Sequence, residues 1–176
     1  MTQTEVKQAI FAFLEQNRIP YRTFTHPKTD TLPEKLENDA RAGIFGATHC
    51  KNLVLANRQK TRFYLLTMTF EKRFRTGPVS RQMASGRLSF AEDAVLERIL
   101  HTHSGAVSPL ELIFDEEKIL SFSADRDLLQ SERICFHPGD ETCTVVLERD
   151  DFFHRFMPAL GLDTNFVTVE SETSEE

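Results

Sequence analysis

Three short groups of residues have the types and spacings that a ligand-binding or catalytic site requires. His26 stands before a proline, and Lys51 with Asn52 begins a nearly continuous apolar run. A lysine there needs a reason, because charged side chains are seldom buried without a partner. The third group joins the turn Gly105–Pro109, whose backbone amides can point at a ligand, with the later Phe-His-Pro stretch at His137. Each group taken alone is more often structural than functional.

The sequence lacks the motifs of the common enzyme classes: it has no P-loop, no dinucleotide-binding glycine pattern, no HExxH and no GxSxG. His101 and His103 lie two apart, but no neighbouring cysteine or acid completes a metal-ligand set, so a position at a helix end explains them better. Cys50 beside Lys51 suggests an activated thiol, yet a free cysteine next to a strand is usually a small core residue. We therefore expect neither a metal ion nor a cysteine nucleophile.

The charge of the chain is unevenly distributed. The stretch from Lys51 to Arg87 carries a net charge of +8, whereas the remainder carries −14 and the whole chain −6. Its basic residues are Lys51, Arg58, Lys60, Arg62, Lys72, Arg73, Arg75, Arg81 and Arg87, and its one acid is Glu71. A basic segment on an acidic body can hold a phosphate backbone locally while the body repels nonspecific nucleic acid. The alternative is a solvated hairpin with its connections.

These groups must be positioned by a mixture of helices and strands. Capping-box spacings and apolar periodicity predict helices over residues 4–17, 33–42 (on the surface), 81–84 and 150–160, with a helical turn at 125–129. A capping box at Ser89 and Glu92 predicts one more helix, which carries Ala91, Ala94, Val95 and Ile99 inward. Apolar runs predict strands at 21–25, 52–56, 62–68, 110–114, 119–122, 133–136 and 143–147. Hairpin-length connections dominate, so the expected fold class is α+β. A single domain over residues 1–169 has a mixed, mostly antiparallel sheet flanked by helices, and residues 170–176 form a disordered acidic tail.

Composition excludes several classes of protein. The 176 residues are 40% hydrophobic and 27% charged, which rules out wholesale disorder, collagen-like repeats and a disulfide-rich miniprotein. No apolar run approaches the roughly 20 residues of a membrane helix, and the N-terminus does not resemble a signal peptide. Cys50, Cys135 and Cys143 are an odd number without tight pairing, which is typical of reduced thiols. We expect a cytoplasmic protein.

Five segments, taken in order, resemble a known family. They read YRTFTHPKTDT, HCKNLVLANR, GRLSFA, GAVSPLELI and ICFHPGDETCTV, and together they span residues 21–147. This ordered set closely resembles the YbaK/ProX family of aminoacyl-tRNA deacylases, which includes the editing domain inserted in bacterial prolyl-tRNA synthetases. Among its subgroups the chain looks most like the freestanding ProX-type enzymes, which hydrolyse alanine mischarged onto the tRNA for proline. The resemblance implies the editing-domain fold of that family.

The resemblance also implies which residues act in catalysis. Lys51 falls on the family's functional lysine, and Gly105 and Pro109 match the Gly-x-x-x-Pro turn that lines the substrate pocket. His137 matches a pocket histidine that follows the penultimate strand. Glu141 is a departure, because relatives usually have an asparagine after the Phe-His-Pro turn, and an added carboxylate changes the electrostatics of the pocket.

Further residues are expected to bind the substrate or the tRNA. Asn52 follows the lysine as it does in the family, and Arg87 stands where relatives often have a basic residue for the tRNA end. The remaining expected binding residues are His26, Ala106, Val107 and Ser108.

The implied reaction is metal-free and substrate-assisted hydrolysis of an aminoacyl ester, without a cofactor. Such an ester is already activated, so hydrolysis needs mainly a positioned water and a stabilised oxyanion. The expected partners are aminoacylated tRNA for proline and a prolyl-tRNA synthetase, with neither membrane nor DNA. Three alternatives stay open: hydrolysis of cysteine from the same tRNA, a noncatalytic module that binds tRNA or a synthetase, and a small-molecule-binding protein with this fold.

Overall fold

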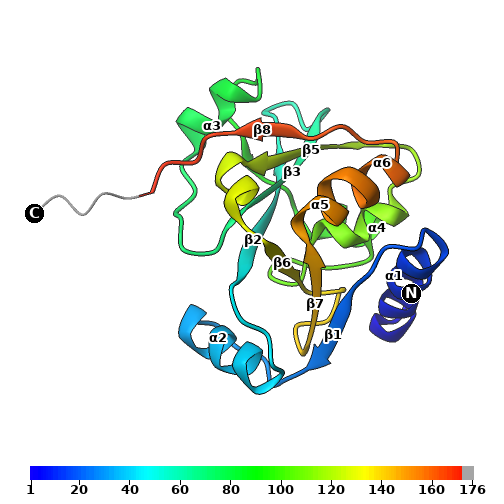
Figure 1. The fold of residues 1–176 in the computed structure, drawn as a ribbon. Helices are drawn as coiled ribbons and strands as arrows, with labels where there is room; N and C mark the ends of the chain where they lie inside the picture. The colour runs from blue at the N-terminus through cyan, green and yellow to red at the C-terminus, as the bar shows by residue number, and fades with distance from the viewer. Residues whose placement is uncertain (172–176) are drawn as a thin grey trace, which may run out of the picture.

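A computed structural model describes residues 1–171 of the chain (Figure 1). The α-helices are α1 (Gln3–Gln16), α2 (Leu32–Arg41), α3 (Thr76–Gln82), α4 (Asp93–Leu100), α5 (Arg149–Asp151) and α6 (Met157–Ala159). Two 3₁₀ segments, η1 (Pro109–Phe114) and η2 (Arg126–Gln130), and one π-helical turn, η3 (Phe152–Phe156), complete the helical elements of these residues. The strands are β1 (Arg22–Thr25), β2 (Ala47–Ala56), β3 (Phe63–Thr69), β4 (Ser89–Phe90), β5 (Leu120–Asp125), β6 (Arg133–Phe136), β7 (Cys143–Glu148) and β8 (Asn165–Val167). Within this part of the chain no helix is long and apolar enough to cross a bilayer.

The strands form one mixed sheet in the order β1-β7-β6-β2-β3-β5-β8, with β4 paired to β2. Four of the pairings, β1–β7, β2–β3, β2–β4 and β6–β7, are antiparallel, and β2–β6, β3–β5 and β5–β8 are parallel. The prediction of a mixed, mostly antiparallel sheet in one α+β domain is therefore confirmed. Strand β2 pairs with three others and forms the centre of the sheet.

The two faces of the sheet carry different layers. One face holds the largest apolar cluster, where α1, α4 and the C-terminal helical segment pack through Ile10, Leu100 and Phe152. The opposite face holds two smaller clusters, one under α3 and one under the connection that follows α2. In Figure 1, α1, α4, α5 and α6 gather on one side of the sheet and α2 and α3 lie on the other. Lys51 lies on this second face, because side chains alternate along β2 and Leu53 and Leu55 pack there.

Two helix starts follow the predicted chemistry. Thr2 and Glu5 form a capping box at α1, and Thr31 and Glu34 form another at α2, so both expectations are confirmed. Most residues of α2 are exposed, which agrees with the predicted surface position, but the three that are buried are polar: Lys35, Asn38 and Asp39. Leu36, by contrast, is 47% exposed.

Several predicted elements differ from the structure. The segment 110–114 is a 3₁₀ helix instead of a strand, because Ser108 and Glu111 form a capping box inside the apolar run. The capping box predicted at Ser89 and Glu92 is also wrong, since Ser89 pairs with β2 and α4 begins only at Asp93. The helix expected at 81–84 is α3, which begins five residues earlier, at Thr76, and ends two residues earlier, at Gln82.

The C-terminal part of the chain contains two features that the sequence did not predict. Strand β8 is unpredicted and pairs in parallel with β5, and the last helix contains the π-helical turn η3. Val169 is buried at 4% exposure, whereas the next residues that the structure describes, 170 and 171, are exposed and have no regular structure. The rest of the predicted disordered tail lies outside the described residues.

Candidate active site

Lys51 projects from the middle of β2 and is held by a backbone carbonyl and an aromatic ring. Its Nζ donates a hydrogen bond to the carbonyl oxygen of Lys72 at 2.8 Å and lies 5.5 Å from the centroid of the Phe70 ring. A second ammonium, that of Lys35 on α2, lies 5.3 Å from the same centroid. Two cations therefore meet at one aromatic ring, in a half-buried place suited to an anion or a ribose oxygen.

The carbonyl that holds Lys51 is itself anchored. The Lys72 ammonium is buried and bonds to Asp125 Oδ1 at 3.0 Å and to Asp127 Oδ2 at 2.7 Å. Asp125 is fully buried and also caps η2 by accepting from the Asp127 backbone N–H. This ion pair fixes the segment after β3, and it neutralises one of the charges that the sequence assigned to the basic segment.

His137 is a neutral imidazole with one nitrogen committed to the fold. Its Nδ1 lies 2.8 Å from the carbonyl oxygen of Cys143, which can only accept, so the ring proton is on Nδ1. Burial lowers the pKa of His137 to about 4. Among the residues that the structure describes, nothing bonds to Nε2, which is left as a hydrogen-bond acceptor. Burial thus removes the charge change near neutrality that an exposed imidazole shows.

Strand register places His137 on the same face as Lys51. Strands β2 and β6 are parallel, and their last pair joins His49 to Cys135. Lys51 follows His49 by two residues on β2, and His137 follows Cys135 by two residues, one position past the end of β6. Side-chain alternation continued by that one residue directs both side chains to the face of the His49–Cys135 pair.

His26 lies beside His137 but has no nitrogen available for a ligand. Its Nδ1–H donates to the Pro27 carbonyl at 2.8 Å, and its Nε2 pairs with the Thr144 hydroxyl at 2.7 Å. The centroids of the His26 and His137 rings are 5.9 Å apart. The geometry therefore assigns His26 to the support of His137, and corrects the expectation that its imidazole binds substrate.

The turn from Gly105 to Pro109 keeps two amides unpaired. Gly105 has φ +88, a conformation that other residues rarely adopt. The N–H of Ala106 donates to the His103 carbonyl and that of Ser108 to the Glu111 carboxylate. Within residues 1–171 the amides of Gly105 and Val107 donate to no other group.

The side chains of this turn point into the protein. Ala106 and Val107 pack in the interior, and the Ser108 hydroxyl bonds to Glu111 at 2.6 Å. Pro109 is buried as the first residue of η1. The expected binding role of Ala106, Val107 and Ser108 is thus restricted to backbone atoms.

Glu111 joins this turn to the β6–β7 hairpin. It is fully buried, and burial raises the pKa of its carboxyl group to about 8. Its Oε1 lies 3.4 Å from the place where Gly139 would carry a Cβ, and that Cβ would also be only 2.7 Å from Val6 Cγ1. Gly139, with φ +67, therefore lets the hairpin pack directly on Glu111.

Glu141 lies on the same hairpin and faces the turn. Its Oε1 is 3.6 Å from the place where Gly105 would carry a Cβ, and its Oε2 is 3.4 Å from Lys28 Nζ. The charge of Glu141 also acts on Lys35, whose pKa is lowered by burial and partly restored by neighbouring carboxylates. A series of neighbours thus runs from Lys51 through Phe70, Lys35 and Glu141 to Gly105.

Two predicted residues lie outside this series. The Asn52 Oδ1 accepts a hydrogen bond from the Thr67 hydroxyl at 2.7 Å, and alternation along β2 turns it to the face opposite Lys51. Arg87 is exposed on the connection between α3 and β4, and no hydrogen bond or ion pair joins it to the series within residues 1–171. The position of Asn52 is a correction to its expected contact with substrate.

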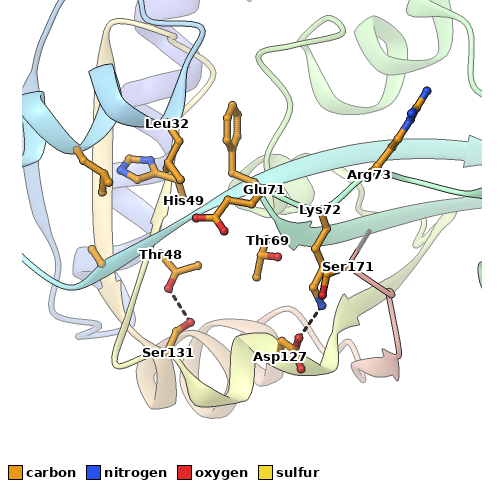
Figure 2. A pocket seen from close by; sticks show the side chains of 13 residues that line it. Leu32, Thr48, His49, Thr69, Glu71, Lys72, Arg73, Asp127, Ser131 and Ser171 are labelled. Atoms are coloured by element: carbon orange, nitrogen blue, oxygen red, sulfur yellow. Dashed lines mark hydrogen bonds and ion pairs between the residues drawn. The ribbon is translucent and has the colours of Figure 1, made fainter. Parts of the chain in front are cut away.

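A cleft of about 700 Å³ opens next to this series (Figure 2). It lies between α2, the start of β2 and the segment after β3, and none of the predicted site residues lines it. Phe70 and Lys72 belong both to its wall and to the surroundings of Lys51. Figure 2 shows carboxylates of Glu71 and Asp127 among its lining groups, with Lys72 paired to Asp127.

One donor set could by its atom types hold a metal ion. Asp39, His49 and Cys135 are buried and bring one ligand atom each within 4.8 Å of the others. His49 Nε2 and Asp39 Oδ2 are 2.6 Å apart, which is a hydrogen-bond distance and shorter than the separation of two ligands on one zinc ion. The geometry indicates an imidazole–carboxylate pair that fastens α2 to the sheet.

The cysteine and the two histidines that the sequence offered as a nucleophile or metal ligands have structural roles. Burial raises the pKa of the Cys50 thiol far above its ordinary value, which removes it as a nucleophile. His101 ends α4 and packs edge-on against Phe114 at 5.0 Å, and His103 bonds to the Ser104 carbonyl.

Sequence reasoning missed Lys35, Glu111 and the Lys72–Asp125 pair. Lys35 and Glu111 both follow a capping residue and look like ordinary first-turn helix residues. The partners of Lys72, Asp125 and Asp127, lie more than 50 residues away in the sequence, so no local pattern in the basic segment indicates the pair.

The sequence and the fold of this chain are similar to those of proteins that edit aminoacyl-tRNA. A family model described as an aminoacyl-tRNA editing domain matches residues 26–154. The prolyl-tRNA editing protein ProX of Acetoanaerobium sticklandii is 28% identical over 147 residues, covering 84% of this chain and 88% of that protein. The prolyl-tRNA synthetase associated domain-containing protein 1 of Bos taurus is 28% identical over 156 residues, covering 86% and 89%. A crystal structure of a candidate trans-editing enzyme for prolyl tRNA synthetase has the same fold, with a TM-score of 0.69 at 16% identity over 95% of this chain and 98% of the other.

Proposed function

This chain belongs to the aminoacyl-tRNA editing domain family, and we propose that it removes alanine from mischarged tRNA for proline as a freestanding enzyme. Family membership makes it a hydrolase of ester bonds. The observation that carries the proposed hydrolysis is the neutral His137, whose Nε2 is an acceptor on the sheet face that carries Lys51. The name of the Acetoanaerobium relative supports tRNA for proline as the substrate. Such a substrate implies work in the cytoplasm.

The proposed reaction uses water and the substrate's own ribose. Water attacks the ester carbonyl, the bond from the carbonyl carbon to the ribose oxygen breaks, and that oxygen takes up a proton to leave free alanine. Nε2 of His137 accepts a hydrogen bond from the neighbouring ribose hydroxyl or from the water. The unpaired amides of Gly105 and Val107 receive the charge that develops on the carbonyl oxygen. The proposal includes neither metal nor cofactor.

The remaining groups hold the substrate. Lys51 and Lys35, which share the Phe70 ring, bind the terminal phosphate or ribose. The Glu141 carboxylate faces Gly105 and suits the α-ammonium group of the amino acid, for which it exchanges its contact with Lys28. A pocket closed by this turn admits alanine, whereas the ring of proline collides with it.

A deacylation assay with alanyl, cysteinyl and prolyl esters of the same tRNA tests the proposal. We expect fast release of alanine and a spared prolyl ester. Faster release of cysteine would reassign the substrate, and hydrolysis of none of the three with tRNA binding retained would indicate a noncatalytic module. We also propose a prolyl-tRNA synthetase as a partner, which the name of the bovine relative supports. Copurification of the two proteins tests that part separately.

A further inference from the structure

We propose that Phe74 and Phe90 form a stacking surface for the unpaired nucleotides that precede the terminal adenosine of the tRNA. The inference rests on the proposed function for the identity of the nucleic acid. It concerns a surface that none of the groups around Lys51, His137 or Gly105 includes.

Phe90 is an exposed aromatic side chain with an aromatic neighbour. Its side chain is 64% exposed on the two-residue strand β4. Its ring centroid lies 5.7 Å from that of Phe74, with the planes tilted by 57°. Phe74 packs against the small apolar cluster beneath α3, so one ring is anchored in the fold while the other stays open to solvent. An exposed ring held beside a second, anchored ring offers a flat aromatic surface on which another planar ring can stack.

Strand register connects this surface to Lys51. Phe90 pairs with Leu55, and directly opposed residues of antiparallel strands share a face. Lys51 stands four residues before Leu55 on β2 and therefore shares that face. Four residues of strand span about 13 Å, which a few nucleotides at about 3.4 Å each bridge. An RNA whose terminal adenosine lies at Lys51 can therefore stack one of the preceding bases on Phe90.

The distribution of charge indicates in which direction from Lys51 the bound RNA runs along the sheet. From Lys51 toward Phe90 the surroundings belong to the basic segment, and exposed Arg87 lies three residues before Phe90. In the other direction lies the cleft of Figure 2, whose wall carries the cations Lys72 and Arg73. The carboxylates of Glu71, Asp127 and Asp125, the last two paired with Lys72, outnumber these two cations and make the cleft less favourable to phosphates. The phosphate backbone is accordingly attracted along β2 toward β4.

The chemistry of the occupant follows from the two rings. Every base presents a flat π surface, so stacking on an aromatic side chain binds single strands with little regard to sequence. Basic residues beside the rings track the backbone, which is the common arrangement in proteins that hold single-stranded nucleic acid. The unpaired 3′ end of a tRNA has these properties, whereas its double-stranded stem hides its base surfaces.

Binding of a short uncharged RNA tests the surface without any catalysis. Fluorescence anisotropy measures the affinity for a labelled single-stranded oligonucleotide that ends in CCA. Phe90→Ala should weaken binding by about 5- to 100-fold, the range expected for the loss of one base–aromatic stack, and Phe90→Trp should restore it. Phe45→Ala is the matched control, because Phe45 is 68% exposed but lies on the connection between α2 and β2. Equal affinity of Phe90→Ala and the unchanged protein, or equal losses in both alanine variants, would overturn the inference.

A comparison of two substrates separates this inference from the proposed function. Phe90→Ala should lower kcat/KM for alanyl-tRNA by the same factor by which it weakens oligonucleotide binding. It should leave hydrolysis of the alanyl ester of adenosine unchanged, because that ester lacks the nucleotides that precede the terminal adenosine. Equal slowing of both substrates would contradict a stacking role. If neither ester is hydrolysed but RNA binding depends on Phe90, the proposed function fails and the surface stands. A change in the oligomeric state of Phe90→Ala would instead assign the ring to contact between protein copies and refute the inference.

Discussion

Lys51 is a cation whose direction is set by its surroundings. Its ammonium group donates one hydrogen bond to the Lys72 carbonyl and lies 5.5 Å from the centroid of the Phe70 ring. A lysine that is held in this way loses little further freedom when it binds an anion, so its charge is available at a defined point.

Lys51→Ala should reduce deacylation of alanyl-tRNA by about 100-fold, the usual effect of deleting one charge-stabilising group. The melting temperature should change little, because the side chain is only half-buried and water can replace Nζ at the Lys72 carbonyl. Single-turnover rates and thermal unfolding measure the two effects. Lys60→Ala is the control, since it removes an exposed lysine of the same segment that pairs with the equally exposed Glu92. A near-normal rate in Lys51→Ala would exclude Lys51 from the mechanism.

His137 sets the expected pH dependence of the reaction. Because burial lowers its pKa to about 4, Nε2 remains an acceptor through the whole range from pH 5 to 8. The enzymatic rate, corrected for the spontaneous hydrolysis of the ester, should therefore stay level down to about pH 5 and fall only near pH 4. His137→Ala should lose most of the rate at every pH. A fall with a midpoint near 6.5 would show that the histidine is more exposed to water during the reaction than in the free protein.

At the scale of elements, the segment after β3 depends on one buried ion pair. Lys72→Ala leaves Asp125 buried without its cation, and breaking such a pair costs about 3–5 kcal/mol. Urea unfolding should show this loss, and the deacylation rate of the folded fraction should fall because the Lys72 carbonyl no longer holds Lys51 firmly. Lys60→Ala breaks an exposed pair and should leave stability almost unchanged. Similar stabilities for the two variants would mean that Asp125 finds another partner.

Glu111 couples η1 to the β6–β7 hairpin in a way that depends on pH. Its folded pKa of about 8 lies above the ordinary value of 4.5, so between these values the folded protein holds a proton that the unfolded chain releases. This contribution to stability is complete below pH 4.5 and is lost as the pH rises to 8. Glu111→Gln keeps an oxygen that accepts from Ser108 but does not ionise. Unfolding free energies at pH 5, 6.5 and 8 should fall in the natural protein relative to the variant, and parallel curves would contradict the buried proton.

The elements that sequence predicted best are those with local chemistry. The capping boxes of α1 and α2 need only residues three apart, and both are present. The same spacing misled at Ser89, because pairing with β2 outweighs a local cap. After Ser108 the error is the opposite, because a capping box is present that was not predicted. The apolar run that follows resembles a strand, but the buried Ser108–Glu111 contact begins a 3₁₀ helix there.

The sequence could indicate only those candidate site residues that belong to a recognisable motif, and not the residues that tertiary packing adds to the site. Lys51 and His137 share a sheet face because β2 and β6 pair in parallel, and Gly105 lies near the β6–β7 hairpin through Glu141. No local pattern in the sequence contains either arrangement. Lys35 could not be found, since its burial depends on how α2 lies over Phe70. For Asn52 the strand alternation was available in the sequence and already separates it from Lys51.

At the scale of the whole molecule, the excess of negative charge belongs to surfaces other than the one proposed for RNA. The basic segment loses Lys72 to a buried pair and Lys60 to Glu92, but exposed arginines remain on the β2–β3 turn, on α3 and before β4. The net charge of −6 therefore does not exclude a phosphate-binding surface. It should restrict that binding to one orientation, because the acidic remainder of the molecule repels the same polyanion.

Affinity for tRNA should consequently fall steeply with salt. Each phosphate contact releases condensed counterions, so the logarithm of the affinity should decline linearly with the logarithm of the salt concentration. Arg87→Ala should weaken binding and reduce that slope by about 0.7 to 0.9, the effect of losing one contact. Arg22→Ala is a suitable control, since Arg22 is exposed on β1 at the other edge of the sheet and outside the basic segment. A flat salt titration, or an equal change of slope in both variants, would show that the RNA docks elsewhere or through uncharged contacts.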